Sequence, residues 1–511
     1  MKVNTVCIVG GGSAGWSTAL AFLKKMGNIE VTLIESSDIG TIGVGEATQP
    51  GVTKFFNEYL GLDEATWIKE TDATYKVGST FTNFNNLEEG DTVNHTFWTH
   101  READHSVYDW GIKKRVIDGV TNRDYSPSLY AAPYMLEDRK FGKRDDTSPW
   151  YACHLDASKF AEFAKTESKK LGLTHILDTV IGVNVGDAGI TSLELKEGGE
   201  VVYDLFIDCT GFSSALIQKA LGSNFIDKTS ELPNDSAIAT RLEYSDKEAE
   251  LKVHTQCTAI SNGWVWEVPL WSRKGTGYVY SSKFVTQEQA ETEFLSHLSS
   301  KYPDSVINDL ELKHLKMRVG YQETPWIKNC VAIGLSSQFL EPLESTGLLF
   351  TVYSIQDCIS LLQTNNRHLN GLMASRYNDS STKMFFEAYD FVLLHYMNTQ
   401  RDDTAYWRHL SSLSPSKNLL DSLYEIEKNG VWKLETSRVF PEISWEHIIT
   451  GFNILDLSDR LTIEGETLDK ERHYDNILAT LEYLKNREVS NTMEVLEMHT
   501  SYQYLRGNIY G

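Results

Sequence analysis

A strand, a glycine-rich turn, a helix and a second strand follow one another at the start of the chain. The first strand is expected at 3–9 (VNTVCIV), an apolar run rich in β-branched residues that ends in three glycines. A helical pattern covers 13–26, and the apolar run 30–35 (EVTLIE) predicts the second strand. This order predicts a βαβ unit and therefore a parallel sheet with a right-handed crossover.

The turn matches the dinucleotide-binding pattern GxGxxG over 10–15 (GGGSAG). Gly10 permits a tight turn, Gly12 lets backbone N–H groups approach a pyrophosphate, and Gly15 allows close packing of the helix on the strand. A glycine turn without a ligand is the alternative interpretation. The strand before the turn and the helix after it favour a nucleotide site.

Three further residues of this unit are expected to contact the nucleotide. Ser13 and Ala14 open the helix, whose N-terminus carries a partial positive charge that favours phosphate. Glu35 ends the second strand, where a carboxylate accepts hydrogen bonds from ribose hydroxyls and disfavours a 2′-phosphate.

Two later strand ends favour FAD over NAD. In 208–212 (DCTGF), Asp208 and Gly211 end a strand-like run, and in 332–335 (AIGL), Gly334 and Leu335 end another. Three such turns, spread over more than three hundred residues, suit a long cofactor such as FAD. The sequence has no second strand–GxGxxG–helix unit for a nicotinamide nucleotide, so the flavin is expected to receive its electrons from another protein.

Composition excludes several other classes of function. Among 511 residues, 71 are acidic and 48 basic, and the resulting net charge of −23 disfavours nucleic acid and membrane surfaces as partners. Six scattered cysteines without a CxxC pair, no signal peptide and no apolar run of about 18–20 residues predict a cytoplasmic protein. No His and Cys spacing indicates a metal site.

The character of the chain changes near residue 366, where strand-like runs become scarce and long helical patterns such as 383–396 and 473–489 begin. We expect an α/β fold with a Rossmann-like FAD-binding body of the glutathione-reductase or monooxygenase type at 1–365. An irregular insertion at 81–150, rich in aromatic and charged residues, is expected to contribute to the substrate site. A mostly helical substrate-binding unit is expected at 366–511.

Four segments together resemble one known family. They are 10–16 (GGGSAGW), 43–48 (GVGEAT), 264–269 (WVWEVP) and 341–347 (EPLESTG), and the resemblance extends from residue 1 to about 450. This combination is similar to the flavin-dependent tryptophan halogenases, which the WxWx[IV]P segment separates from flavin monooxygenases.

The resemblance implies an activity and its partners. In that family, FADH2 supplied by a separate flavin reductase reacts with O2, and a flavin hydroperoxide oxidises halide to hypohalous acid. The acid passes through the protein to a lysine, which Lys76 matches, and an electron-rich aromatic substrate is then halogenated. A homo-oligomer is also expected.

The resemblance further assigns residues to roles. Lys76 and Glu344 are the expected catalytic residues, and backbone at Thr346 and Gly347 is expected to hold halide. The remaining expected sites are FAD contacts at Gly45, Glu46 and Ala47, flavin shielding by Trp264 and Trp266, and substrate stacking by His95, Phe97 and Trp445.

The chemistry of these residue types agrees with the roles without requiring them. An ammonium can polarise hypohalous acid, and an amine can be converted into a haloamine; both alternatives stay open for Lys76. Glu344 can orient the oxidant and accept the ring proton. Without the resemblance, Lys76 would be taken for a solvated lysine, Glu344 for a helix cap, and Trp264 and Trp266 for core residues.

One segment departs from the family. Tryptophan-specific members have a stretch rich in tyrosine and glutamate before the C-terminal aromatic residue, whereas 436–442 (TSRVFPE) has no tyrosine. The departure favours an indole, a phenol or another electron-rich arene without charged amino-acid ends. An FAD-dependent aromatic hydroxylase and a non-catalytic flavin-binding protein are the alternative functions.

Overall fold

The computed structural model describes residues 1–38, 45–88, 91–97, 139–141, 151–429, 438–452, 454 and 499–510. Within these ranges, no helix is both long enough and apolar enough to cross a bilayer. All six cysteines lie in the described part, where they are buried free thiols.

The N-terminal βαβ unit is confirmed, with β1 (Thr5–Val9), α1 (Ser13–Lys25) and β2 (Glu30–Glu35). The six-stranded sheet around it has the order β20-β21-β12-β1-β2-β8. Its other strands are β8 (Thr174–Leu177), β12 (Leu205–Asp208), β20 (Trp326–Ile327) and β21 (Cys330–Ala332). Every neighbouring pair is parallel except β20 with β21, so the expected parallel sheet is present.

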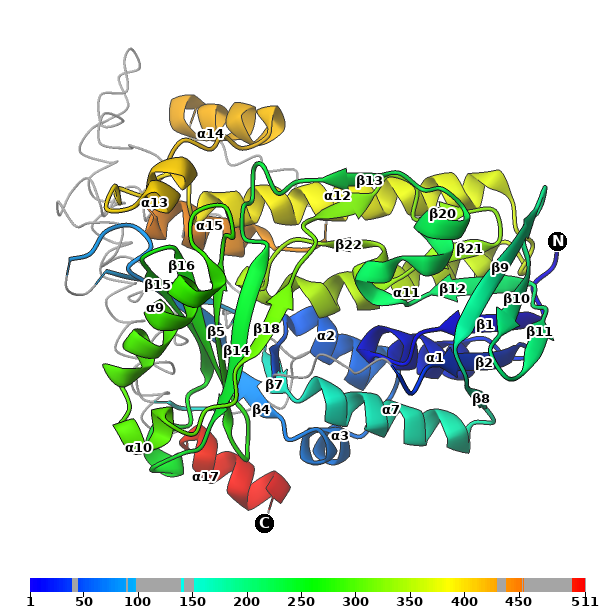
Figure 1. Cartoon of the computed structure of the whole chain (residues 1–511), viewed down its shortest axis with the longest axis horizontal. Helices are drawn as coiled ribbons and strands as arrows, with labels where there is room; N and C mark the ends of the chain where they lie inside the picture. Colours follow the sequence, from blue (N-terminus) through cyan, green and yellow to red (C-terminus); the bar gives the residue numbers. More distant parts are fainter. Residues whose placement is uncertain are drawn as a thin grey trace, which may run out of the picture.

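Helix α1 lies between two further helices, α7 (Ala157–Lys170) and α11 (Thr346–Thr364) (Figure 1). Asp156 caps α7 by accepting hydrogen bonds from the N–H groups of Ser158 and Lys159. The interior residues of β1 are fully buried, as expected for a parallel strand covered on both faces.

A seven-stranded sheet forms the second layer, with the order β18-β14-β17-β16-β15-β5-β6. Its strands are β5 (Gly78–Thr82), β6 (Thr92–Thr96), β14 (Ser236–Leu242), β15 (His254–Ile260), β16 (Gly263–Pro269), β17 (Lys274–Tyr280) and β18 (Lys313–Lys316). Strand β6 corrects the expectation of irregular structure at the start of 81–150, because it pairs regularly with β5. Most of that segment lies outside the described residues.

Three small sheets complete the body. Strand β7 (Ala152–Leu155) pairs with β3 (Glu46–Ala47) on one side and β4 (Thr74–Lys76) on the other. The other two sheets comprise β9 (Val180–Gly186), β10 (Gly189–Leu195) and β11 (Gly199–Val201), and β13 (Phe225–Asp227), β19 (Gly320–Gln322) and β22 (Gln338–Phe339). The β3-β7-β4 sheet brings two segments of the expected site together.

The described residues after 365 are mainly helical, as the sequence predicts. Their helices are α12 (Gly371–Leu394), α13 (Ala405–Leu410), α14 (Lys417–Asn429), α15 (Glu442–Gly451) and α17 (Ser501–Leu505). Shorter helices earlier in the chain are α2 (Pro50–Lys54), α3 (Glu64–Glu70), α8 (Lys247–Glu250), α9 (Gln287–Ser299) and α10 (Asp304–Ile307). The helix expected at 473–489 lies outside the described residues.

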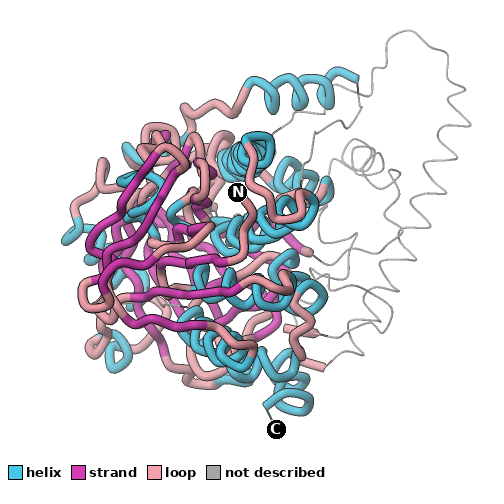
Figure 2. Tube along the Cα trace, turned by 90° about the vertical axis from the view of Figure 1, so that its right-hand side faces the viewer, coloured by secondary structure: helices cyan, strands magenta, loops and turns pink. Residues whose placement is uncertain are grey.

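One hydrophobic core joins the two expected units. It contains Val6 of β1, Phe391 of α12 and Trp445 of α15, all buried. Figure 2 shows strands running through the middle of the described structure, with helices on either side of them. The boundary at residue 365 therefore stays a prediction, but the elements on both sides of it pack as one body.

Candidate active site

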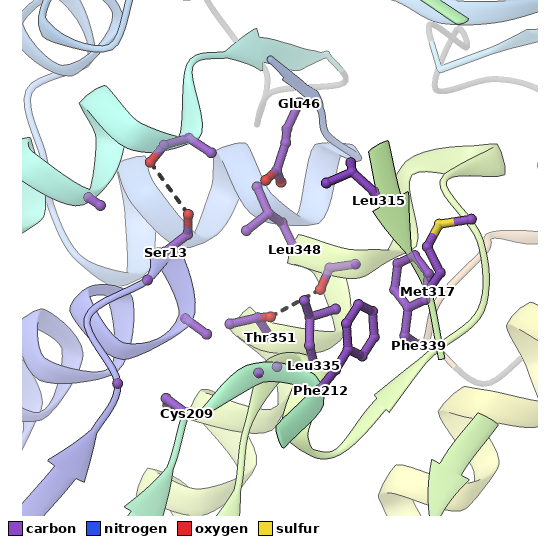
Figure 3. A pocket seen from close by; sticks show the side chains of 18 of the residues that line it. Ser13, Glu46, Cys209, Phe212, Leu315, Met317, Leu335, Phe339, Leu348 and Thr351 are labelled. Atoms are coloured by element: carbon purple, nitrogen blue, oxygen red, sulfur yellow. Dashed lines mark hydrogen bonds between the residues drawn. The ribbon is translucent and has the colours of Figure 1, made fainter. Parts of the chain in front are cut away.

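A cavity of about 720 Å³ opens where three strands of the parallel sheet end. Figure 3 shows Ser13, Cys209 and Leu335, which follow β1, β12 and β21, around this cavity. The predicted cofactor residues that line it are Gly10, Gly12, Ser13, Ala14, Glu35, Gly45, Glu46, Ala47, Gly211, Gly334 and Leu335. We call it the cofactor cavity.

The glycine turn has the geometry that a pyrophosphate needs. Gly10 has a φ of 116°, which favours glycine, and a Cβ at Gly15 would overlap the carbonyl oxygen of Gly10. A Cβ at Gly12 would instead meet open space, and no side chain caps the first amides of α1. Those amides are therefore available to an anion. Gly15 itself does not line the cavity; its role is the close packing of α1.

Glu35 lies in the cavity wall, as a ribose-binding carboxylate should. Its Oε1 accepts hydrogen bonds from His175 Nε2 at 2.9 Å and from Lys165 Nζ at 3.3 Å. These two contacts hold the carboxylate in place and leave Oε2 for a ligand.

Glu46 is a second carboxyl group in the wall, visible in Figure 3. Burial, and then the negative charge of Asp156, raise its pKa to about 7. At neutral pH this carboxyl group is therefore protonated in a large fraction of molecules and can donate as well as accept a hydrogen bond.

Asp208 does not line the cofactor cavity, contrary to the sequence prediction. Its carboxylate accepts hydrogen bonds from the N–H groups of Leu216 and Ile217, both at 2.8 Å, and from Thr210 Oγ1 at 2.6 Å. The side chain therefore stabilises the turn that presents Gly211 to the cavity, rather than facing the cavity itself.

Trp264 and Trp266 both line the cavity, from one face of β16. Their ring centroids are 6.3 Å apart at an angle of 62°. Trp264 Nε1 donates to Glu341 Oε1 at 3.3 Å, and that buried carboxylate also accepts from Tyr396 OH at 2.5 Å and Asn234 Nδ2 at 3.0 Å. A buried polar network thus fixes the orientation of one indole.

Lys76 ends β4 and is completely buried, but it is not among the described residues that line the cofactor cavity. Its Nζ donates to the carbonyl oxygen of Thr48 and to Ser345 Oγ, both at 3.1 Å, and lies 5.1 Å from the centre of the Phe97 ring. Burial lowers the pKa of Lys76 to about 8, although the Glu344 carboxylate opposes the shift. Both protonation states are therefore accessible near neutral pH.

Glu344 and Ser345 form a strained turn between the cavity and Lys76. Both residues have left-handed backbone conformations, with φ of 64° and 59°, and both line the cavity. Gln49 Nε2 donates to the carbonyl oxygen of Glu344 at 2.6 Å and supports this turn.

Two histidines contact the Glu344 carboxylate, which is fully buried. His95 Nδ1 lies 2.9 Å from Oε1 and 2.8 Å from Oε2, and His395 Nε2 lies 2.9 Å from Oε1. Burial alone would raise the pKa of Glu344, but the hydrogen bonds from both imidazoles and the positive charge carried by this histidine pair outweigh it and hold the pKa well below its usual range. Glu344 is therefore ionised at neutral pH. We call Lys76, His95, Phe97, Glu344, Ser345 and His395 the Lys76 cluster.

The expected halide residues open α11. Gly347 lines the cofactor cavity, whereas Thr346 is buried beside it. Ser345 precedes them as the N-cap, and no side chain accepts from the first amides of this helix. These amides and the helix N-terminus provide an environment that favours an anion.

The three expected substrate residues, His95, Phe97 and Trp445, are all buried. His95 lies in β6, Phe97 follows that strand, and Trp445 lies in α15. The centroid of the His95 ring lies 5.3 Å from that of Phe97 and 5.5 Å from that of Phe391. The ring centroids of Phe391 and Trp445 are 5.0 Å apart. His95 Nε2 also lies 2.8 Å from Ser444 Oγ. Both ring nitrogens of His95 thus have hydrogen-bond partners. The sequence analysis expected only stacking from this residue.

Several residues of this site were not predicted from the sequence. Two of them carried a signal: Ser345 lies inside the EPLESTG segment, and His395 lies in 394–396 (LHY), a further short segment that resembles the family. Gln49 directly follows GVGEAT, of which Gly43 and Val44 lie outside the described residues. Nothing in the sequence pointed to Ser444, because a single serine on a helix has many ordinary roles.

Comparison with known proteins decides the family. A model described as tryptophan halogenase matches residues 5–462. The chain belongs to the tryptophan halogenase family. It is a flavin-dependent aryl halogenase with the mixed α/β fold of that family.

Individual relatives resemble this halogenase over most of its length. The tryptophan 6-halogenase SttH of Streptomyces toxytricini is 35% identical over 465 residues, which cover 86% of each chain. The tryptophan 7-halogenase RebH of Lentzea aerocolonigenes is 34% identical, covering 80% of this chain and 78% of RebH. The structure of Tar14, a tryptophan C-6 halogenase from taromycin biosynthesis, superimposes with a TM-score of 0.85 at 30% identity, covering 99% of this chain and all of Tar14.

Proposed function

We propose that this halogenase forms hypohalous acid in the cofactor cavity and uses it at the Lys76 cluster. The observation that carries the proposal is the position of Lys76, which is buried outside the cavity and joined to its wall through Ser345. We expect an oxidant formed in the cavity to reach the amine by passing this turn.

The cofactor is FAD, used as FADH2 that a separate flavin reductase supplies. When bound, the reduced flavin supplies the electrons with which O2 becomes an oxidant for halide. Gly10, Gly12, Ser13 and Ala14 would hold the phosphates, and Glu35 the ribose. Halide would bind at the backbone of Thr346 and Gly347, where it can be partly dehydrated before it reacts.

Lys76 binds and polarises the hypohalous acid. Two of its N–H groups are directed at Thr48 and Ser345, so an ammonium has one further donor and a neutral amine has a lone pair. At neutral pH, below the pKa of about 8, the ammonium form predominates. Hydrogen bonding to the oxygen of hypohalous acid makes its halogen more electrophilic.

Glu344 accepts the proton that the ring carbon loses after halogen addition. The carboxylate is ionised and lies on the same strained turn as Ser345, the partner of Lys76. A base and an electrophile carrier are thus held on adjacent parts of one site.

The substrate is an electron-rich arene, an indole or a phenol. The described walls near the Lys76 cluster are aromatic, with Phe97, Phe391, Phe440 and Trp445 buried. Arg438, a possible receptor for a carboxylate, already pairs with Asp357 at 2.6 Å. Stacking by such walls contributes about 0.5–1.5 kcal/mol per ring pair.

Product analysis tests this function. The enzyme is incubated with a flavin reductase, NADH, FAD, O2 and bromide, and indole, phenol and tryptophan are each offered as substrate. We expect mass spectrometry to find brominated indole or phenol, with a higher kcat/KM than for tryptophan. Hydroxylated product would indicate an aromatic monooxygenase, and no product from any arene would favour a flavin-binding protein.

A further inference from the structure

His395 lies at the C-terminal end of α12 and is almost completely buried. Its Nδ1 lies 2.9 Å from the carbonyl oxygen of Phe391, one turn earlier in the helix. Its Nε2 lies 2.9 Å from Glu344 Oε1. The imidazole therefore bridges a helix terminus and the carboxylate of the Lys76 cluster.

These two partners determine where the protons are. A carbonyl oxygen can only accept a hydrogen bond, so Nδ1 must carry a proton. The 2.9 Å contact between Nε2 and Glu344 Oε1 needs one proton between the two atoms, either on Nε2 or on the carboxyl group. With the proton on Nε2, His395 is an imidazolium whose positive charge lies against the negative charge of Glu344.

His95, the other histidine on this carboxylate, does not need a charge. Its Nε2 faces the hydroxyl of Ser444, which can donate, and its Nδ1 can then donate to Glu344 as a neutral imidazole. The contacts thus distinguish two histidines that look equivalent by distance alone.

We propose that His395 is a positioning residue for Glu344, acting as a fixed imidazolium that keeps the carboxylate ionised and holds its Oε1. The proposal rests on the role of Glu344 as proton acceptor. Oε1 is occupied by His395 and His95, whereas Oε2 shares His95 with only a long contact of 3.4 Å from Gln49. His95 Nδ1 also lies 2.8 Å from Oε2, but the second contact of Oε2 is the longer one, so Oε2 is the oxygen that is more available to the ring proton.

Five other titratable groups face this pair from the surrounding elements: Lys76, His95, Cys257, Glu341 and His447. Burial raises the pKa of the Cys257 thiol and lowers that of His447 to about 3, so both are neutral at pH 5–8. Burial also raises the pKa of Glu341, so this is the carboxyl group to be distinguished from Glu344 in a pH profile.

The test uses the full-length enzyme with FAD, a flavin reductase, bromide and indole. His395→Phe removes both the charge and the hydrogen bond, and His395→Asn removes the charge but keeps an amide donor. In both variants, the acid limb of the pH profile of kcat/KM should move upward by about one to three pH units. His395→Asn should recover part of the rate above that limb, because Oε1 regains a donor.

Two comparisons make the result specific. His297→Asn replaces a partly buried histidine of α9, remote from the cluster, and should leave the acid limb unchanged. In a Glu341→Gln, His395→Asn double variant, the shifted limb should persist. Folded, FAD-binding His395 variants whose acid limb matches that of the wild type would overturn the proposal, as would loss of the shift in the double variant.

Neutron diffraction from wild-type crystals tests the same inference without a substitution or turnover. At neutral pH it should show deuterium on both ring nitrogens of His395 and none on the Glu344 carboxylate. A neutral His395, or a protonated Glu344, would overturn the proposal. If the wild type halogenates no arene while both deuterium atoms are present, the proposed function fails and the charge assignment stands.

Discussion

The cofactor cavity and the Lys76 cluster share one strained turn, Glu344 and Ser345, yet they are built in different ways. Backbone turns at three strand ends form much of the cavity, and their glycines provide close approach and free amides. Side chains from β4, β6, η6 (Leu343–Ser345) and the end of α12 form the cluster, where hydrogen bonds hold the lysine, the carboxylate and both histidines. The first region is suited to hold a large ligand, and the second to hold charges and protons.

The largest effect is expected from Lys76→Ala, which should reduce arene halogenation by about 10²- to 10⁴-fold because the polarising amine is lost. FAD binding should remain unchanged, since Lys76 does not line the cavity. Steady-state turnover and flavin fluorescence titration measure the two quantities. The control is Lys274→Ala, which removes a buried lysine that pairs with Glu250 rather than with a residue of the cluster and should retain activity. Weakened FAD binding in Lys76→Ala would show that the two regions are not separate.

The converse change is Gly12→Val, which places a side chain in the open space where we propose that phosphate binds. It should weaken FAD binding by at least about tenfold, equivalent to about 1.4 kcal/mol, without preventing folding, because a Cβ there meets no atom within 4 Å. Gly27→Val, at another open glycine, is the matched control. The dissociation constant and the circular dichroism spectrum are measured. Normal FAD binding by Gly12→Val would show that the glycine turn does not bind the cofactor.

The two regions also differ in how far the sequence could predict them. The glycine turn is largely local: residues 10–15 fix the geometry among themselves and against the ends of the two strands beside β1, β2 and β12. The Glu344–His395 contact joins side chains 51 positions apart, and its hydrogen-bond pattern depends on the tertiary packing of α12. The place of Asp208 could not be predicted for the same reason, because only the folded turn shows that its carboxylate accepts from the amides of Leu216 and Ile217 and does not line the cavity.

The pH dependence tests the charge state of Lys76. Because burial lowers its pKa to about 8, the ammonium is present below that pH and lost above it. The halogenation rate should therefore fall by up to about tenfold for each pH unit above 8. The measurement is kcat for indole bromination between pH 6 and 10, with FAD saturating. A rate that rises through pH 8 would instead support the amine and the haloamine alternative.

A smaller effect is expected from Trp264→Phe, in the wall of the cavity. The change keeps an aromatic ring but removes the hydrogen bond to Glu341, and should lower the free energy of unfolding by about 0.5–1.5 kcal/mol. Peroxide released per halogenated product should rise two- to threefold as a rough estimate, because the indole is held less firmly. Denaturant unfolding and peroxide assays measure both.

Trp407→Phe provides the comparison for that change. Trp407 Nε1 donates to the carbonyl oxygen of Ile260 at 2.8 Å, and Trp407 does not line the cofactor cavity. Loss of this hydrogen bond should lower the free energy of unfolding by a similar amount but leave the ratio of peroxide to product unchanged. An equal rise in peroxide for both variants would contradict a specific role of Trp264 in the cavity.

The central claim is that the oxidant is made in one region and used in the other. The most direct measurement is the yield of free hypohalous acid from Lys76→Ala, trapped with monochlorodimedone in the presence of a flavin reductase, O2 and bromide. We expect the variant to form trapped oxidant at a rate close to that of the wild type while it halogenates almost no indole. Loss of the trapped oxidant together with the brominated indole would contradict the claim, because Lys76 would then be needed where the oxidant is formed.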